Sequence, residues 1–281
     1  MLLVTGATGD IGGHLVHALA DAGAGVRALT RDPARAAGLP PRAERVVGDL
    51  GEPSTLPAVF AGIERFFLLT PGMGTANVAN ALAAAREAGV RHVVHLSSDN
   101  VLLADPMPLM AGWHHEREEL VRASGIPWTI LRPAGFMSNA LQWRDSVCEG
   151  YVLDPSGPGR YAPIDTADIA AVAAVVLTSD GHEGKEYVLT GGELMTCADQ
   201  VKILGDVLGR EIEVRQAGSP EEVVRARFAS GAPKMLAEAL VEGYTRLRAD
   251  VIGSRSDTAE RLLGRPTATF RDWCERHADA F

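Results

Sequence analysis

The chain of 281 residues has little cysteine. Its three cysteines, Cys148, Cys197 and Cys274, lie far apart and form no C-x-x-C pair. Neither a disulfide framework nor a cysteine-based zinc site is therefore indicated. So few cysteines suit a reducing compartment, and we expect a cytoplasmic protein.

Positive charge and long apolar runs are also scarce. The formal net charge is -9, which offers no basic patch to nucleic acid. No apolar run approaches the ~20 residues that a membrane span needs. The apolar start is broken at Gly6 and follows no charged segment, unlike a signal peptide. We expect neither nucleic acid nor a membrane as partner, but a small molecule bound by a monomer or homodimer.

The N-terminal segment MLLVTGATGDIG is the most informative part of the chain. The apolar run Leu2–Val4 predicts a buried strand, and the pattern Ile11–Ala22 predicts a helix. Between them Gly6, Gly9 and Gly12 are spaced three apart, unlike the commoner G-x-G-x-x-G. A helix start offers free N–H groups to an anion, and glycine lets a pyrophosphate approach the backbone. We predict a dinucleotide site; the alternative is a tight turn without a ligand.

Apolar runs and helical patterns alternate through the first half of the chain. The runs lie at Leu2–Val4, Val26–Leu29, Arg45–Val47, Phe66–Leu69, His92–Leu96 and Trp128–Leu131, and the helical patterns at Ile11–Ala22, Thr75–Ala88 and Met110–Ala123. Such alternation predicts an α/β fold with a doubly wound parallel sheet, which binds ligands at the carboxyl ends of its strands. The residues at those ends are Gly6, Arg31, Asp49, Thr70, Pro71, Ser97, Ser98, Arg132 and Pro133.

After Pro133 the pattern becomes mainly helical, with one more strand at Glu186–Leu189. Helix starts are indicated at Asp165–Asp168, Thr196–Asp199 and Ser219–Glu222. Helices are expected at Ile169–Leu177, Ala198–Leu208, Pro220–Ala229, Pro233–Arg248 and Phe270–Ala278. We expect residues 1–133 and 164–192 to form the nucleotide-binding domain. Residues 134–163 and 193–281 are expected to form a smaller, mostly helical substrate-binding lobe within one compact unit.

The end of the second strand bears on the choice of cofactor. A site for NAD usually has Asp or Glu there, whereas this strand ends in Arg31. A guanidinium fork suits the 2′-phosphate of NADP, so we predict NADP(H) over NAD(H). Asp32 is expected to cap the next turn. The alternative interpretation of Arg31 is an ordinary solvated side chain that binds no phosphate. Asp49 is placed to meet the adenine end, or else it is a turn residue before Pro53.

Several segments resemble the NmrA-like branch of atypical short-chain dehydrogenases/reductases. They are Thr5–Gly12, Thr30–Pro33, Val94–Ser98, Ser124–Pro133, Phe136–Asn139, Asp165–Ala170 and Tyr187–Gly191, and the resemblance weakens after about Gln216. It implies a Rossmann-type domain, NADP(H) as the cofactor and a variable lobe that selects the substrate. Members reduce quinones, triphenylmethane dyes or aromatic ethers, and some are redox-sensing regulators. The expected cofactor contacts are Gly6, Thr8, Gly9, Asp10, Ile11, Gly12, Arg31, Asp49, Leu50, Thr70, Pro71, Ser97 and Pro133.

The tyrosine typical of short-chain reductases is missing. No tyrosine precedes Tyr151, so the predicted helix Met110–Ala123 has no Tyr-x-x-x-Lys acid. His114 and Glu118, four residues apart on one face, are the first substitute, as in quinone-reductase-like members. Trp113 and Arg117 form a second pair at the same spacing. We expect Glu118 to raise the pKa of His114, which then donates a proton, while Ser98 hydrogen-bonds the substrate oxygen.

Two other interpretations of this helix stay open. A helix rich in His, Glu and Arg is often a solvated face with ion pairs. No metal site is expected, because the adjacent His114 and His115 diverge on a helix and no third-ligand pattern lies nearby.

Without a strong general acid, reduction of an ordinary ketone should be slow. A quinone, an enone or a cationic dye needs less protonation when hydride arrives. We therefore predict hydride transfer from NADPH to a flat, conjugated, apolar acceptor; the alternative is a non-catalytic NADP(H)-sensing regulator of NmrA type. Candidate substrate contacts, half of which we expect to be ordinary core, are Met73, Met110, Trp113, Phe136, Met137 and Trp143.

Overall fold

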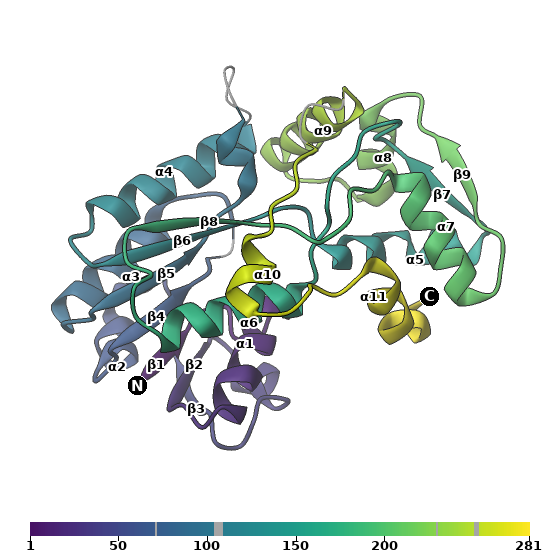
Figure 1. Cartoon of the computed structure of the whole chain (residues 1–281). Helices are drawn as coiled ribbons and strands as arrows, with labels where there is room; N and C mark the ends of the chain where they lie inside the picture. The colour runs from purple at the N-terminus through teal and green to yellow at the C-terminus, as the bar shows by residue number, and fades with distance from the viewer. Residues whose placement is uncertain (71, 104–108, 229, 250–252) are drawn as a thin grey trace.

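The computed structural model describes residues 1–70, 72–103, 109–228, 230–249 and 253–281. Within these residues, seven parallel strands form the main sheet in the order β3-β2-β1-β4-β5-β6-β8 (Figure 1). They are β1 (Leu2–Val4), β2 (Val26–Thr30), β3 (Glu44–Val47), β4 (Arg65–Leu68), β5 (His92–Leu96), β6 (Trp128–Pro133) and β8 (Lys185–Leu189). Leu2 pairs with Val26 on one side and with Arg65 on the other, so the strand order reverses beside β1. In doubly wound sheets such a switch point opens the ligand crevice.

Helices cover both faces of the sheet, as predicted. One face packs against α1 (Asp10–Asp21) and α6 (Thr166–Thr178). The other packs against α2 (Leu56–Phe60), α3 (Ala76–Glu87) and α4 (Leu109–Ala123). Neighbouring strand residues point to opposite faces, so Leu3 and Val4 enter different cores. Both faces are buried, which explains why these strands appear as continuous apolar runs.

The second lobe contains a small parallel sheet that we did not predict. It pairs β7 (Tyr151–Asp154) with β9 (Glu213–Gln216), two short strands that are partly exposed. The lobe's helices are α5 (Arg144–Cys148), α7 (Cys197–Leu208), α8 (Pro220–Arg227), α9 (Lys234–Arg248), α10 (Thr258–Leu263) and α11 (Phe270–His277). Short 3-10 segments are η1 (Pro33–Ala36), η2 (Pro53–Thr55), η3 (Asp99–Leu102), η4 (Met137–Trp143) and η5 (Ala278–Ala280).

The helix-start predictions have different outcomes. Asp165 caps α6 by accepting from the Ala167 N–H, and Thr196 with Asp199 forms a capping box on α7, as predicted. The expected cap of Ser219 on α8 is wrong, because its side chain makes no bond to the helix backbone. Glu222 instead accepts from the Gly218 N–H at 2.8 Å, one residue further back. The last residue of the predicted helix, Ala229, lies outside the described residues.

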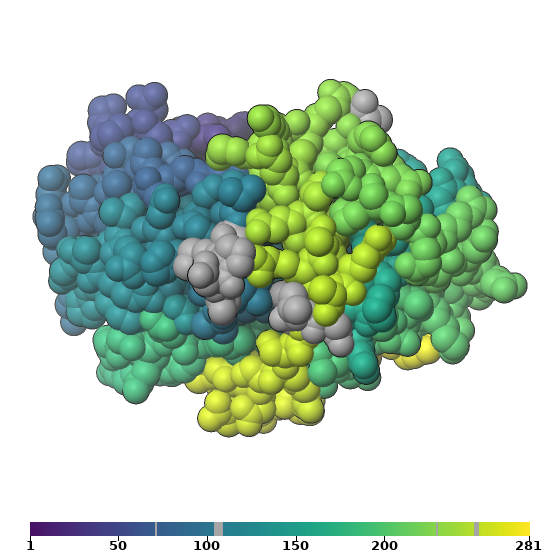
Figure 2. Space-filling view, turned by 90° about the horizontal axis from the view of Figure 1, so that it is seen from above, coloured from purple at the N-terminus to yellow at the C-terminus, as the bar shows by residue number. Residues whose placement is uncertain are grey.

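Helix α9 lies between the two halves of the molecule. Seen from above in Figure 2, its lime-coloured residues separate the blue-teal first half from the green second lobe. It packs against α4 and α8, and the carbonyl of Leu247 presses on Gly159 so closely that a Cβ there would lie 1.7 Å from it. None of the described helices is long and apolar enough to cross a membrane.

Candidate active site

The glycine turn between β1 and α1 has the geometry of an anion cradle. Gly6 has φ +65°, a conformation that glycine adopts without strain. Gly9 is the N-cap of α1 and brings no side chain over the helix start. A Cβ on Gly12 would lie 2.2 Å from the Gly6 carbonyl oxygen, so the helix and the turn are in backbone contact. The open helix start and the absent side chains fit a dinucleotide pyrophosphate.

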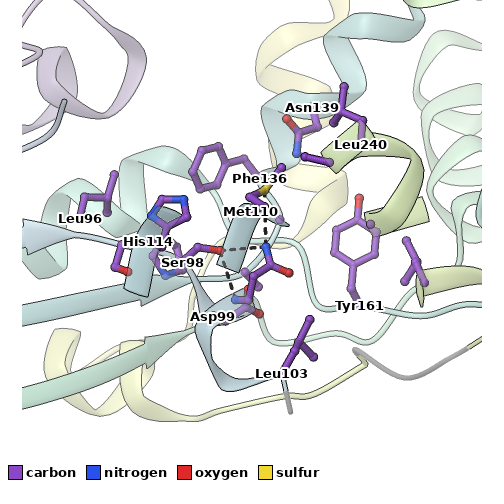
Figure 3. A pocket seen from close by; sticks show the side chains of 18 of the residues that line it. Leu96, Ser98, Asp99, Leu103, Met110, His114, Phe136, Asn139, Tyr161 and Leu240 are labelled. Atoms are coloured by element: carbon purple, nitrogen blue, oxygen red, sulfur yellow. Dashed lines mark hydrogen bonds between the residues drawn. The ribbon is translucent and has the colours of Figure 1, made fainter. Parts of the chain in front are cut away.

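A cavity of about 880 Å³ opens where β4, β5 and β6 end, and α9 forms its opposite wall. Figure 3 shows side chains from both sides of this cavity. Four of the predicted cofactor contacts line it, namely Ile11, Thr70, Ser97 and Pro133. Ser98, His114, Met110 and Phe136 line it as well. The hydroxyl of Thr70 is buried without a hydrogen-bond partner in the described structure, which fits a polar ligand group at this end.

Other predicted cofactor residues lie along the sheet edge outside this cavity. Thr8 is in the glycine turn, Asp10 is the first residue of α1, and Arg31 is exposed directly after β2. Asp32 caps η1 by accepting from the Ala34 N–H, as expected. Asp49 accepts from the Gly51 N–H at 2.8 Å and therefore makes a turn.

The last two predicted cofactor contacts are Leu50 and Pro71. The side chain of Leu50 is buried in the core beneath α3. Pro71 lies outside the described residues.

Glu118 is fully buried, and its carboxylate joins three elements. It accepts from the Ser97 hydroxyl at 2.6 Å, from Arg132 Nε at 2.9 Å and Nη2 at 2.6 Å, and from Arg122 at 2.7 Å. Burial alone would raise the pKa of Glu118, but hydrogen bonds from Arg132 and Ser97 outweigh it and hold the pKa below its ordinary value. Glu118 thus fastens α4 to β5 and β6.

The expected effect of Glu118 on His114 is therefore wrong. The pKa of His114 is lowered to about 4, first by burial and then by the charge of Arg117, and the weaker influence of Glu118 does not offset this. His114 lines the cavity as a neutral imidazole whose Nδ1 has no partner in the described structure. In the second candidate pair, the guanidinium of Arg117 is engaged by the backbone, because it donates to the carbonyls of Gly72 and Gly74.

The predicted apolar contacts divide between cavity and core. Met110 and Phe136 line the cavity. Met137 is buried in the core of the second lobe, and Trp143 packs against that core. Met73 and Trp113 are half-buried and do not line the cavity. Nowhere in the described ranges do three or more His, Cys, Asp or Glu side chains gather in a way that could hold a metal.

Sequence reasoning missed several residues of the cavity. Asp99 directly follows Ser98, so the strand-end rule could have found it, whereas Leu240 and Tyr244 come from α9 and only the tertiary fold brings them here. Tyr161 is also part of the wall, where its ring packs on Gly135. Burial raises the pKa of Asp99 to about 7 and that of Tyr161 to about 12, while hydrogen bonds oppose both shifts.

Comparison with known proteins gives consistent findings. Residues 6–180 match a family described as NAD(P)H-binding. A (4-alkanoyl-5-oxo-2,5-dihydrofuran-3-yl)methyl phosphate reductase from Streptomyces griseus is 38% identical, over 100% of this chain and 99% of its own. An NAD(P)H azoreductase from Xenophilus azovorans is 36% identical with the same coverage. The crystal structure of an NADPH-dependent quinone oxidoreductase from Escherichia coli, complexed with NADPH, superposes with a TM-score of 0.86 at 28% identity, covering 98% of this chain and 99% of that one.

Proposed function

Since the chain belongs to the NAD(P)H-binding, NmrA-like family of atypical short-chain dehydrogenases/reductases, we propose that it transfers hydride from NADPH to a flat, conjugated, apolar acceptor. One observation carries the proposal. The cavity joins the strand ends beside the glycine turn to a wall of apolar side chains, including Met110, Phe136 and Leu240. That arrangement holds a flat molecule against the reactive end of a bound dinucleotide.

The chain's own residues have separate tasks in this proposal. The turn from Gly6 to Gly12 holds the pyrophosphate, and Arg31 binds the 2′-phosphate. The hydroxyl of Thr70 and the backbone near Pro133 position the nicotinamide, which supplies the hydride when bound. Residues 1–133 and 164–192 form the nucleotide-binding domain. Residues 134–163 and 193–281 select the acceptor, although α10 of this range packs against α6 and β8.

The relatives support a conjugated acceptor. The Streptomyces griseus protein is named for the methyl phosphate of an acylated dihydrofuranone, the Xenophilus azovorans protein for azo compounds and the Escherichia coli protein for quinones. Each of these compound classes contains a conjugated unsaturated group, which can take up hydride and spread the added electron pair. Such acceptors need less help from a strong acid than a simple ketone does.

The test is to follow NADPH absorbance at 340 nm with a panel of quinones, enones, azo dyes and saturated ketones. We expect turnover of the conjugated acceptors and little turnover of the ketones. Tight NADPH binding without turnover of any acceptor would contradict the proposal and favour an NADP(H)-sensing regulator. The missing Tyr-x-x-x-Lys pair is the feature that keeps this second function open.

Arg31→Ala is expected to weaken NADPH binding about 10- to 100-fold and to change NADH binding less than about threefold. Its guanidinium is exposed at the end of β2, and charge-assisted bonds to a phosphate contribute about 1.5–3 kcal/mol. Fluorescence titration with both nucleotides measures the ratio of the two Kd values. Arg35→Ala, an exposed arginine in η1, is the matched control. If Arg31→Ala weakened the binding of NADPH and of NADH equally, the assignment of Arg31 to the 2′-phosphate would be wrong.

His114→Ala is expected to lower kcat/KM about tenfold and leave the Kd of NADPH unchanged. The neutral imidazole lines the cavity and binds the acceptor, and a lost hydrogen bond with lost packing costs about 1.4 kcal/mol. Because its pKa is near 4, His114 should add no titration to kcat between pH 6 and pH 9. The exposed neighbour His115→Ala is the control. Equal activity of His114→Ala and His115→Ala would exclude His114 from the site.

A further inference from the structure

Asp99 is a carboxyl group in the cavity that has so far been given no task. It is the first residue of η3, which follows β5 after Ser97 and Ser98, and it lines the same cavity as Ser98 and His114 (Figure 3). It is half-buried, and Leu102 and Met110 line the cavity beside it. No side chain in the described structure forms an ion pair with it. The Ser98 hydroxyl and the N–H groups of Asn100 and of Asp99 itself favour its charged form and lower its pKa, against the effect of burial.

The hydroxyl of Ser98, the residue before Asp99, is held by Asn100. Its oxygen accepts from the Asn100 N–H at 3.2 Å and from Asn100 Nδ2 at 3.0 Å. A hydroxyl oxygen has two lone pairs, so both are used and the group is left with its proton to donate. Asp99 is a neighbouring acceptor for that proton, and hydrogen bonding by Ser98 favours the charged form of Asp99. Asn100 therefore holds the Ser98 hydroxyl next to Asp99, with its proton directed by neither of these two bonds.

Few of the ionisable side chains around the cavity change protonation near neutral pH. Burial raises the pKa of Asp99 to about 7, so its carboxyl group is about half protonated at neutral pH. On α4, His114 is neutral and Arg117 stays charged, while on β6 Arg132 is bound to Glu118 and Glu186.

The opposite wall offers no acid in this range. Arg227 on α8 brings a guanidinium and no carboxyl group, and burial raises the pKa of Tyr244 on α9. Among the described residues of the cavity, Asp99 is thus the group that releases a proton near pH 7.

We propose that Asp99 is the proton donor to the reduced acceptor. As a carbon of the acceptor gains hydride, the electron pair of its unsaturated bond moves to the conjugated oxygen. The carboxyl proton of Asp99 passes to that oxygen. The acceptor has then gained one hydride and one proton, NADPH has become NADP⁺, and the carboxylate takes a proton from water at the cavity mouth. This inference rests on the proposed reductase function.

The decisive experiment compares acceptors that differ in their need for a proton. A cationic triphenylmethane dye becomes neutral on gaining hydride and needs none, whereas an enone needs one. Asp99→Asn should lower kcat for the enone about 100-fold or more, lower it less for a quinone, and leave the dye within about twofold. Asp99→Glu should restore part of the enone activity. Asp21→Asn, an exposed carboxylate at the end of α1, is the control.

The pH profile adds a second arm. Because the protonated carboxyl is the active form, enone kcat in the wild type should fall as pH rises through about 7. The dye reaction and the Asp99→Asn enzyme should show no such fall. Equal losses of dye and enone activity in Asp99→Asn, or an unchanged enone profile, would overturn the donor role. Wild-type protein that turns over no acceptor at all would instead overturn the proposed function, and the donor role with it.

A third arm needs neither cofactor nor substrate. Infrared difference spectra of the free protein should show a protonated carboxyl band that titrates near pH 7 and is absent in Asp99→Asn. The folded pKa lies above the unfolded one, so the wild type loses stability as pH rises from about 4 to about 7. The Tm of Asp99→Asn should therefore exceed that of the wild type at pH 8 but not at pH 4. Absence of the band and of the Tm difference would contradict the proposal.

Discussion

Glu118→Gln should lower the free energy of unfolding by about 3 kcal/mol, the largest loss that we expect from a single side chain on α4. The change removes one charge from a fully buried carboxylate and leaves Arg132, itself 8% exposed, without its close partner. An uncompensated buried charge costs about 3–5 kcal/mol, and the remaining pair of Arg132 with Glu186 keeps the loss at the lower end. Urea unfolding followed by circular dichroism measures it.

The neighbouring carboxylate gives the control for Glu118→Gln. Glu119 binds the same Arg122, but its side chain is 58% exposed, so Glu119→Gln should cost less than about 1 kcal/mol. The folded pKa of Glu118 is depressed, so its contribution is present above the unfolded carboxyl pKa and is lost as pH falls through the folded value. The difference between wild type and Glu118→Gln should therefore shrink on acidification. Equal costs for the two variants would contradict the structural role of Glu118.

The sheet and most helices could be predicted from the sequence because neighbouring residues determine where they form. A strand buried on both faces appears as a short apolar run, as in β1 and β5, wherever it lies in the sheet. The start of α6 was predictable because Asp165 bonds a backbone N–H only two residues away. The strands β7 and β9 were missed because they are short, partly exposed and paired across a long separation in sequence.

The candidate site shows where local spacing fails. His114 and Glu118 stand four residues apart on α4, a spacing that brings side chains together on an isolated helix. In the fold, β6 brings Arg132 to Glu118 from 14 residues away, and a fully buried carboxylate binds the guanidinium in preference. The residues of α9 in the cavity are likewise set by how the second lobe folds back over the sheet. The spacing of residues along α4 predicts neither the pairing of Glu118 with Arg132 nor the position of α9 at the cavity.

Gly12→Ala is expected to weaken NADPH binding more than 100-fold and to lower the free energy of unfolding by several kcal/mol. An alanine Cβ there would lie 2.2 Å from the Gly6 carbonyl oxygen and 3.0 Å from the Ala7 Cα. Both atoms belong to the backbone, so relief requires α1 to move away from the turn. That movement displaces the N–H groups that we propose hold the pyrophosphate and disturbs the contact between β1 and α1.

Gly13 provides a matched control for this substitution in the same turn of α1. A Cβ on Gly13 would lie 3.7 Å from the Ala7 carbonyl oxygen, which is an ordinary contact. Alanine inside a helix is more favourable than glycine by about 0.5–1 kcal/mol, so Gly13→Ala should be at least as stable as the wild type. Fluorescence titration with NADPH and thermal unfolding of both variants give the comparison. If Gly12→Ala bound NADPH as tightly as Gly13→Ala does, the backbone contact at Gly6 would not be what holds the nucleotide.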